Sequence, residues 1–131
     1  MKLTQYLTER YTSPQAIQQL KKQFTQNKPF PHLSLRQFFP TKPLLKVHEV
    51  LVQEEFIERD TDLYQFMQTQ HDIQATQNAA LKKFFAFFSS KEFIDYMSTL
   101  TGIRLNGGVD MSGFIYRKGD YLLCHDDRLE G

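Results

Sequence analysis

A single cysteine, no tryptophan and almost no net charge set the first limits on this sequence. Of 131 residues only Cys124 is a cysteine, which excludes an internal disulfide and a zinc site built from several thiols. We expect Cys124 to be a small, buried apolar residue. The 16 Lys+Arg and 15 Asp+Glu leave a formal net charge of +1. A chain so balanced has no strong field for phosphates, so we expect no direct binding to nucleic acid.

Long hydrophobic runs are also missing. The longest apolar run covers residues 84–88, far short of the ~20 residues that cross a bilayer. The first ten residues lack the apolar stretch of a signal peptide. We therefore expect a cytoplasmic protein with no membrane partner. The length and the 40% hydrophobic content favour one folded domain over residues 1–131.

Hydrophobic periodicity predicts helices in the first hundred residues and strands around and after them. The expected helices run from Ser13 to about residue 27, over residues 42–53 and 78–89, and from a capping box at Ser89 and Glu92 to Gly102. The expected strands cover residues 30–35, 56–57, 63–67, 109–116 and 121–127. Phe87 lies off the apolar stripe of its helix, so it is either exposed or faces a second element. The fold class predicted is α+β, with helices backing a mainly antiparallel sheet.

The segment His125-Asp126-Asp127 is the candidate site. Side chains two residues apart in a strand point the same way, so His125 and Asp127 would lie side by side, with Asp126 and Cys124 on the opposite face. An imidazole and a carboxylate are two of the three ligands of the 2-His-1-carboxylate triad that holds Fe(II). Of the four histidines only His125 has a carboxylate two residues on. The alternative is a polar strand end with solvated carboxylates.

Two ordered blocks of sequence resemble a known family. The first runs from Asp110-Met111-Ser112 through Tyr116 to Leu122-Leu123-Cys124-His125-Asp126-Asp127, followed by Leu129-Glu130-Gly131. The second is Asp62-Leu63-Tyr64-Gln65-Phe66-x-Gln68. Together they resemble the Fe(II)- and 2-oxoglutarate-dependent oxygenases, and within them the ribosomal prolyl hydroxylases. The resemblance extends over about residues 29–131.

The resemblance implies a distorted double-stranded β-helix, a jelly-roll-like sheet, with the N-terminal helices packed outside it. It implies that His125 and Asp127 are iron ligands and that Tyr116 lines the pocket for the cosubstrate 2-oxoglutarate, with ascorbate as a possible further cofactor. The alternative for Tyr116 is an ordinary half-buried strand tyrosine. The partner implied is a protein substrate with a target proline, ribosomal or other.

The sequence departs from the family pattern at its end. The family continues with strands that carry a distal histidine ligand and a basic residue for 2-oxoglutarate, and no such residues follow the motif here. We therefore expect this chain to hold the N-terminal portion of the domain, with an incomplete sheet and no activity by itself. Two functions remain open at this point: a peptidyl-prolyl hydroxylase in the full-length protein, or a non-catalytic remnant or partner-binding module of the same fold.

Overall fold

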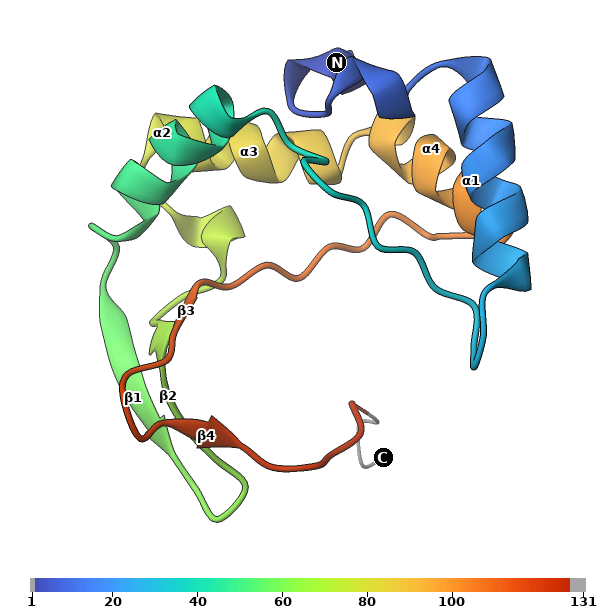
Figure 1. The fold of residues 1–131 in the computed structure, drawn as a ribbon. Coiled ribbons are helices and arrows are strands. Elements are labelled where there is room, and N and C mark those ends of the chain that lie inside the picture. The colour runs from blue at the N-terminus through green and yellow to red at the C-terminus, as the bar shows by residue number, and fades with distance from the viewer. Residues whose placement is uncertain (1, 128–131) are drawn as a thin grey trace.

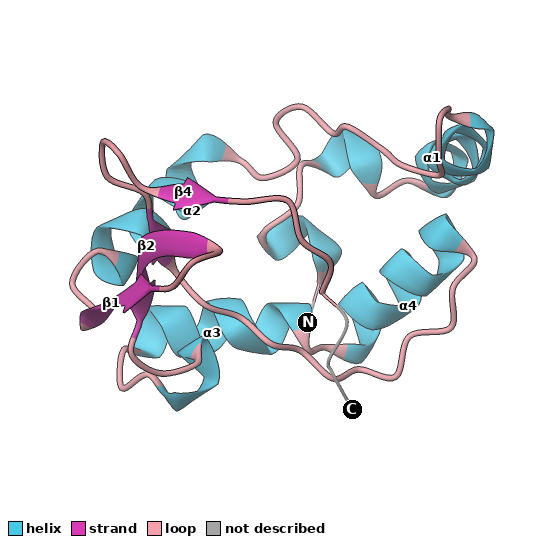
Figure 2. Cartoon of the chain, turned by 90° about the horizontal axis from the view of Figure 1, so that it is seen from below, coloured by secondary structure: helices cyan, strands magenta, loops and turns pink. Residues whose placement is uncertain are grey.

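The chain folds into a layer of helices with a small sheet attached at one end, so that the ribbon curves round an open side (Figure 1). This computed structural model describes residues 2–127. Seen from below, the strands gather at one end of the molecule and α1 and α4 at the other (Figure 2). The predicted α+β class is confirmed. Within the described residues, no helix has both the length and the apolar character needed to cross a membrane.

The four predicted helices are present, with the caps that local sequence chemistry favours. They are α1 Pro14–Gln26, α2 Thr41–Leu51, α3 Ala79–Phe88 and α4 Lys91–Thr101, and the short 3₁₀ turns are η1 Leu3–Gln5, η2 Glu9–Tyr11 and η3 Ile73–Ala75. Ser13 caps α1 by accepting the Ala16 N–H. Gly102 ends α4 at φ +73°, in the left-handed region that glycine enters without steric cost.

The predicted capping box of α4 is wrong by one residue. Ser90, not Ser89, accepts the Phe93 N–H at 3.3 Å. The Ser89 hydroxyl instead donates to the Phe85 carbonyl at 3.0 Å, within the last turn of α3. Two adjacent serines thus serve two helices, because the last carbonyls of α3 and the first N–H groups of α4 both need partners.

The helices enclose a core rich in aromatic rings. Its buried members are Leu7, Leu20, Phe87, Tyr96 and Leu100. Phe87 has no exposed surface, and its ring centroid lies 4.9 Å from that of Tyr6 and 5.2 Å from that of Phe93. Of the two alternatives for Phe87, the structure therefore shows contact with a second element. A smaller cluster of Val47, Ile73 and Leu81 joins α2, η3 and α3.

The strand predicted over residues 30–35 is wrong, because this segment is a loop between α1 and α2. Its backbone bonds to side chains rather than to another strand. The Asn27 amide donates to the His32 carbonyl at 2.9 Å, and the Tyr11 hydroxyl donates to the Arg36 carbonyl at 2.6 Å. Leu33 and Leu35 pack against the helical core, so their apolar character reflects burial under a loop and not a sheet.

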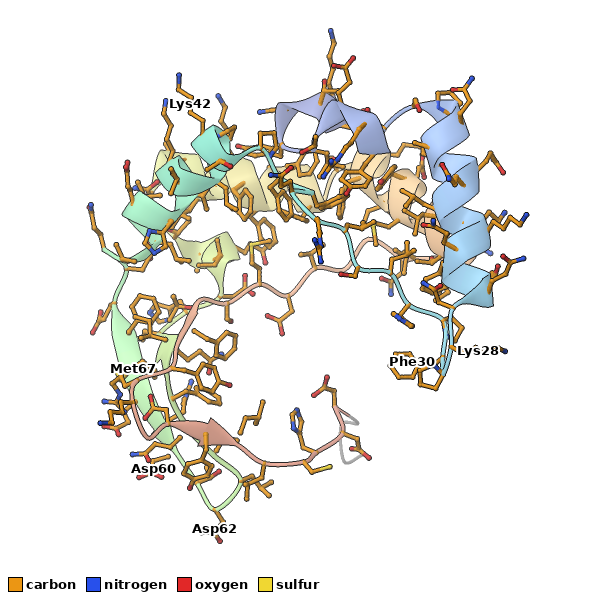
Figure 3. All side chains as sticks on the ribbon, viewed as in Figure 1. Lys28, Phe30, Lys42, Asp60, Asp62 and Met67 are labelled. Carbon is orange, nitrogen blue, oxygen red and sulfur yellow. The ribbon has the colours of Figure 1, made fainter. Side chains whose placement is uncertain are left out.

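The sheet is antiparallel and is built around β2. It contains β1 Phe56–Asp60, β2 Tyr64–Thr69, β3 Phe114–Ile115 and β4 Tyr121–Leu122. Asp60 and Asp62 mark the turn that joins β1 to β2 (Figure 3). Gln65 pairs with Asp60 on one side and with Tyr121 on the other. β3 and β4 therefore share the second edge of β2, and residues 116–120 make a detour between them.

The last two strands are much shorter than predicted. Residues 109–116 contribute two strand residues and residues 121–127 two more. Before β3 the backbone bonds to the segment around η3 instead, as when the Ile73 N–H donates to the Met111 carbonyl at 2.8 Å. After β4 only the bond from the Leu123 N–H to the Leu63 carbonyl, at 2.8 Å, continues the pairing. In the described residues the sheet is open, consistent with part of a jelly roll.

Candidate functional site

A hollow of about 470 Å³ opens on one face of the sheet. Its lining brings together the three residues singled out in the sequence and four apolar neighbours: Tyr64, Phe66, Phe114, Tyr116, Leu122, His125 and Asp127. Met67, the residue after Phe66, lies on the outer side of the sheet (Figure 3). Since neighbouring strand residues point to opposite faces, the hollow lies on the inner side of the curve.

Aromatic rings form the floor of the hollow, and strand register explains why they meet. Tyr64 and Phe66 share one face of β2, and their rings stack with centroids 4.8 Å apart. Phe114 and Tyr116 are also two residues apart, and β3 pairs with β2 so that both reach Phe66, at 5.2 and 5.3 Å between ring centroids. Phe66 is buried while Phe114 and Tyr116 are about half exposed. The floor is thus apolar, and the rings of Phe114 and Tyr116 leave it accessible to solvent.

His125 and Asp127 lie against each other at the rim. The distance from His125 Nε2 to Asp127 Oδ1 is 3.3 Å. His125 Nδ1 lies 2.9 Å from the Leu123 carbonyl oxygen. A carbonyl can only accept, so Nδ1 is the donor there, and in the neutral ring the lone pair sits on Nε2, beside the carboxylate. The Asp127 side chain is 97% exposed.

His125 and Asp127 lie side by side as expected, but they do not belong to a strand as predicted. β4 ends at Leu122, and residues 123–127 form a bend held by the bond between His125 and the Leu123 carbonyl. Cys124 was expected to be buried, and this is wrong: it is exposed. Beyond β4 no described element packs over the bend, so alternation alone does not bury a side chain there.

The two side chains are chemically suited to a metal ion but are too few to enclose one. No group of three His, Cys, Asp or Glu residues within residues 2–127 is placed to hold a metal. A neutral imidazole nitrogen beside an anionic oxygen is a donor set suited to Fe(II). The other ring nitrogen of His125, Nδ1, bonds to a backbone carbonyl. A bond of this kind orients the imidazole in metal-binding histidines. His125 and Asp127 therefore fit two positions of the implied triad.

A polar network on the opposite face was missed in the sequence. Arg117, in the detour between β3 and β4, contacts Asp120 Oδ2 through Nε at 3.1 Å and Glu58 Oε1 of β1 at 3.0 Å. Hydrogen bonds to Arg117 hold the pKa of both carboxyls below their ordinary values, and they raise the pKa of Arg117. Only the Asp120 partner is visible locally, as a turn, because Glu58 lies 59 residues away. Phe114 and Leu122 were also missed, though the alternation of Phe114 with Tyr116 was a usable signal.

Among known proteins, two prolyl 3-hydroxylases are similar in sequence to most of this chain. The chain is 34% identical over 104 residues to a prolyl 3-hydroxylase OGFOD1 of Xenopus laevis and 35% identical over 107 residues to that of Mus musculus. Each match covers 79% of this chain and 20% or 19% of the relative. The chain thus spans about a fifth of the length of the curated relatives that it matches.

No family model matches the chain. Of the two blocks that suggested a family, the first ends with residues 129–131, which lie outside the described residues. The remainder of both blocks lies in β2 and the turn before it, in the segment from residue 110 through β3 to Tyr116, and in β4 and the bend after it. The resemblance seen in the sequence is confirmed by the two relatives: over most of its length the chain is similar to a part of OGFOD1 prolyl 3-hydroxylases.

Proposed function

We propose that this chain provides part of the iron and 2-oxoglutarate site of a peptidyl-prolyl hydroxylase. The observation that carries the proposal is that Tyr116, His125 and Asp127 line the same hollow. The reaction would consume a prolyl residue, 2-oxoglutarate and O₂ and release hydroxyproline, succinate and CO₂, so that one oxygen atom enters the ring and the other enters succinate. The relatives are prolyl 3-hydroxylases by name. A ribosomal protein as the substrate, ascorbate as a cofactor and a cytoplasmic location remain part of the proposal.

In this proposal His125 and Asp127 are two ligands of the metal. Bound Fe(II) supplies the oxidising chemistry that an unactivated C–H bond requires. The Leu123 carbonyl holds His125 with its Nε2 lone pair beside Asp127. Such a preset orientation lowers the entropy lost when the ion binds. A further histidine and a basic residue would come from sequence equivalent to the rest of the relatives' length.

Tyr116 would orient the cosubstrate. Its phenol can donate a hydrogen bond to a carboxylate, and the rings of Phe66 and Phe114 beside it exclude water from one side of the hollow. A hydrogen bond to a carboxylate in such surroundings is stronger than one in bulk water. The half-exposed ring of Tyr116 is accessible to a ligand that enters the hollow.

Paramagnetic broadening by Mn²⁺ tests the ligand assignment in the 131-residue chain. We expect millimolar Mn²⁺ to broaden the NMR signals of His125 and Asp127 first, because two ligands bind a dication weakly but suffice to bring it near. Asp127→Asn should reduce the broadening at His125 at least about tenfold, since it replaces the anionic oxygen with a neutral amide. Asp126→Asn is the matched control, an adjacent residue of the same type, and should keep most of the broadening. Broadening centred elsewhere, or lost in Asp126→Asn and kept in Asp127→Asn, would contradict the assignment.

A further inference from the structure

The segment that carries Phe114 and Tyr116 is hydrogen-bonded to the rest of the fold just before it joins the sheet. The Ile73 N–H donates to the Met111 carbonyl at 2.8 Å, and the Thr69 N–H donates to the Gly113 carbonyl at 2.9 Å. The Gly113 N–H donates back to the Thr69 hydroxyl at 3.1 Å. Residues 111–113 are therefore held against residues 69–73, at the end of β2.

The Asp72 side chain joins both halves of this junction through two backbone N–H groups. Its Oδ1 accepts the Gln74 N–H at 2.7 Å, which caps η3. Its Oδ2 accepts the Met111 N–H at 2.8 Å, across 39 residues of sequence. One half-buried carboxylate thus satisfies two backbone donors that belong to different segments. Removing it would leave the Met111 N–H without this acceptor, which costs more than a solvent-exposed bond would.

Asp110 completes the junction from the strand side. Its carboxyl hydrogen-bonds to Asp72, and this bond, with the negative charge of Asp72, raises the pKa of Asp110. Burial pushes the pKa of Asp72 upward, but the amide donors of Met111 and Gln74 and the bond from Asp110 outweigh it and lower that pKa. Asp72 is accordingly the charged partner to which the strand segment binds.

We propose that Asp72 is a positioning residue for the candidate site. By holding Met111 it sets where β3 begins along β2, and so keeps Phe114 and Tyr116 over Phe66. Tyr116 lies five residues beyond Met111, and between them are the bonds of Gly113 to Thr69 and the two-residue pairing of β3. So short a ladder defines its register weakly by itself, and a slip of one residue would turn Tyr116 to the other face of the sheet. What the hollow binds rests on the proposed function, but the positioning of its rings does not.

The test is made on the 131-residue chain by NMR. In Asp72→Ala we expect amide hydrogen exchange at Met111 to speed up at least about tenfold, and the ring-to-ring cross-peaks between Phe66 and Tyr116 to weaken or vanish. Asp72→Asn keeps one acceptor oxygen and should restore much of the contact between the rings. It also keeps the test decisive should the alanine variant not fold.

Asn78→Ala is the control for general loss of stability. Asn78 caps α3 by accepting the N–H groups of Ala80 and Leu81, and in the described structure it makes no hydrogen bond to residues 110–113. We expect Asn78→Ala to leave the Phe66–Tyr116 cross-peaks intact. Unchanged cross-peaks in Asp72→Ala would overturn the proposal, and so would an equal loss in Asn78→Ala.

The same samples separate this proposal from the proposed function. Mn²⁺ broadening at His125 should persist in Asp72→Ala, because the two ligands lie on a different segment from β3. The change in the Tyr116 ring signals on adding 2-oxoglutarate should be lost. If the unaltered chain shows no response to either probe, the proposed function fails, while exchange at Met111 and the ring contacts still decide the role of Asp72.

Discussion

Arg117 connects β1 to the turn between β3 and β4, on the face of the sheet away from the hollow. Glu58 pairs with Met67, the neighbour of Phe66, so alternation places Glu58 on the opposite face from the aromatic floor. Arg117 reaches it across β2 while also holding Asp120, whose side chain is only 4% exposed. The Asp120 carboxylate in turn accepts the Arg117 N–H at 2.8 Å. The detour between β3 and β4 is therefore closed by one side chain and its two carboxylates.

Replacing this arginine should change how the fold responds to acid. The pKa values of Glu58 and Asp120 lie below their ordinary 4.5 and 3.8 in the folded chain, first of all because of the hydrogen bonds to Arg117. A lowered carboxyl pKa contributes stability above the unfolded pKa, and this is lost as the pH falls through the folded value. In Arg117→Gln both pKa values should rise toward the ordinary ones, as measured by NMR titration of the carboxyl carbons. The drop in unfolding free energy between pH 6 and pH 3 should become smaller.

Arg59→Gln is the matched control. Arg59 follows Glu58 directly in β1, and it donates to the Gln68 amide oxygen at 3.3 Å rather than to a carboxylate. Its replacement should leave the titration of Glu58 unchanged. A Glu58 pKa that rises as much in Arg59→Gln as in Arg117→Gln would show that net charge, and not the direct contact, causes the shift.

At the scale of the elements, β3 is held by the segment before it more than by its own ladder. It shares two paired positions with β2, whereas β1 pairs along five. Gly113 lies where this segment passes closest to α2. A Cβ added there would lie 2.9 Å from Leu51 Cδ1 and 3.1 Å from Thr69 Cγ2. An added methyl group at this position would therefore force the Leu51 or Thr69 side chain to shift.

Gly113→Ala should therefore destabilise the chain by about 1–3 kcal/mol through overpacking. The measurement is urea unfolding followed by circular dichroism. Gly108→Ala serves as the control, since the nearest atom to its added Cβ is Asn106 Oδ1 at 3.4 Å, and it should change stability by about 0.5 kcal/mol or less. A Gly113→Ala variant as stable as the unaltered chain would mean that Leu51 yields freely.

At the scale of the whole molecule, the aromatic core joins the N-terminal turns to helices that follow much later. Phe87 of α3 contacts Tyr6 and Phe93, and the Tyr96 hydroxyl of α4 donates to the Tyr11 carbonyl at 3.0 Å. Burial raises the pKa of Tyr96 to about 12, so this phenol stays protonated, and able to donate, across the neutral range. The helical layer is thus one packed unit that includes residues from both ends of the first hundred.

Phe87→Ala should cost about 3–5 kcal/mol, as for other fully buried phenylalanines that are cut back to alanine. Thermal or urea unfolding measures the loss. Phe30→Ala removes the same ring from a loop where it is 62% exposed (Figure 3), and it should cost about 0.5 kcal/mol or less. Similar losses in the two variants would be incompatible with the core described above.

Much of the helical layer could be predicted because helix signals are local. Ser13, Asn78 and Gly102 act within one turn of the helices that they bound, and a period of 3.6 is readable in a short window. The loop over residues 30–35 could not be, since alternating apolar residues look alike whether they face a sheet or lie under helices. Strand lengths could not be predicted either, because a strand ends where its hydrogen-bonded partner strand ends.

By itself the sequence determined the class of the fold, the family that the chain resembles and the residues to examine. The family blocks and the pair His125 and Asp127 can be found in the amino-acid sequence without knowledge of any tertiary contact. Only the tertiary structure decided that β3 and β4 share one edge of β2, that a bend rather than a strand brings His125 to Asp127, and that Asp72 reaches Met111. For the shared edge of β2 and for the contact of Asp72 with Met111, the physical reason is distance along the chain. These contacts join segments up to some 60 residues apart, and their geometry depends on how the intervening helices pack.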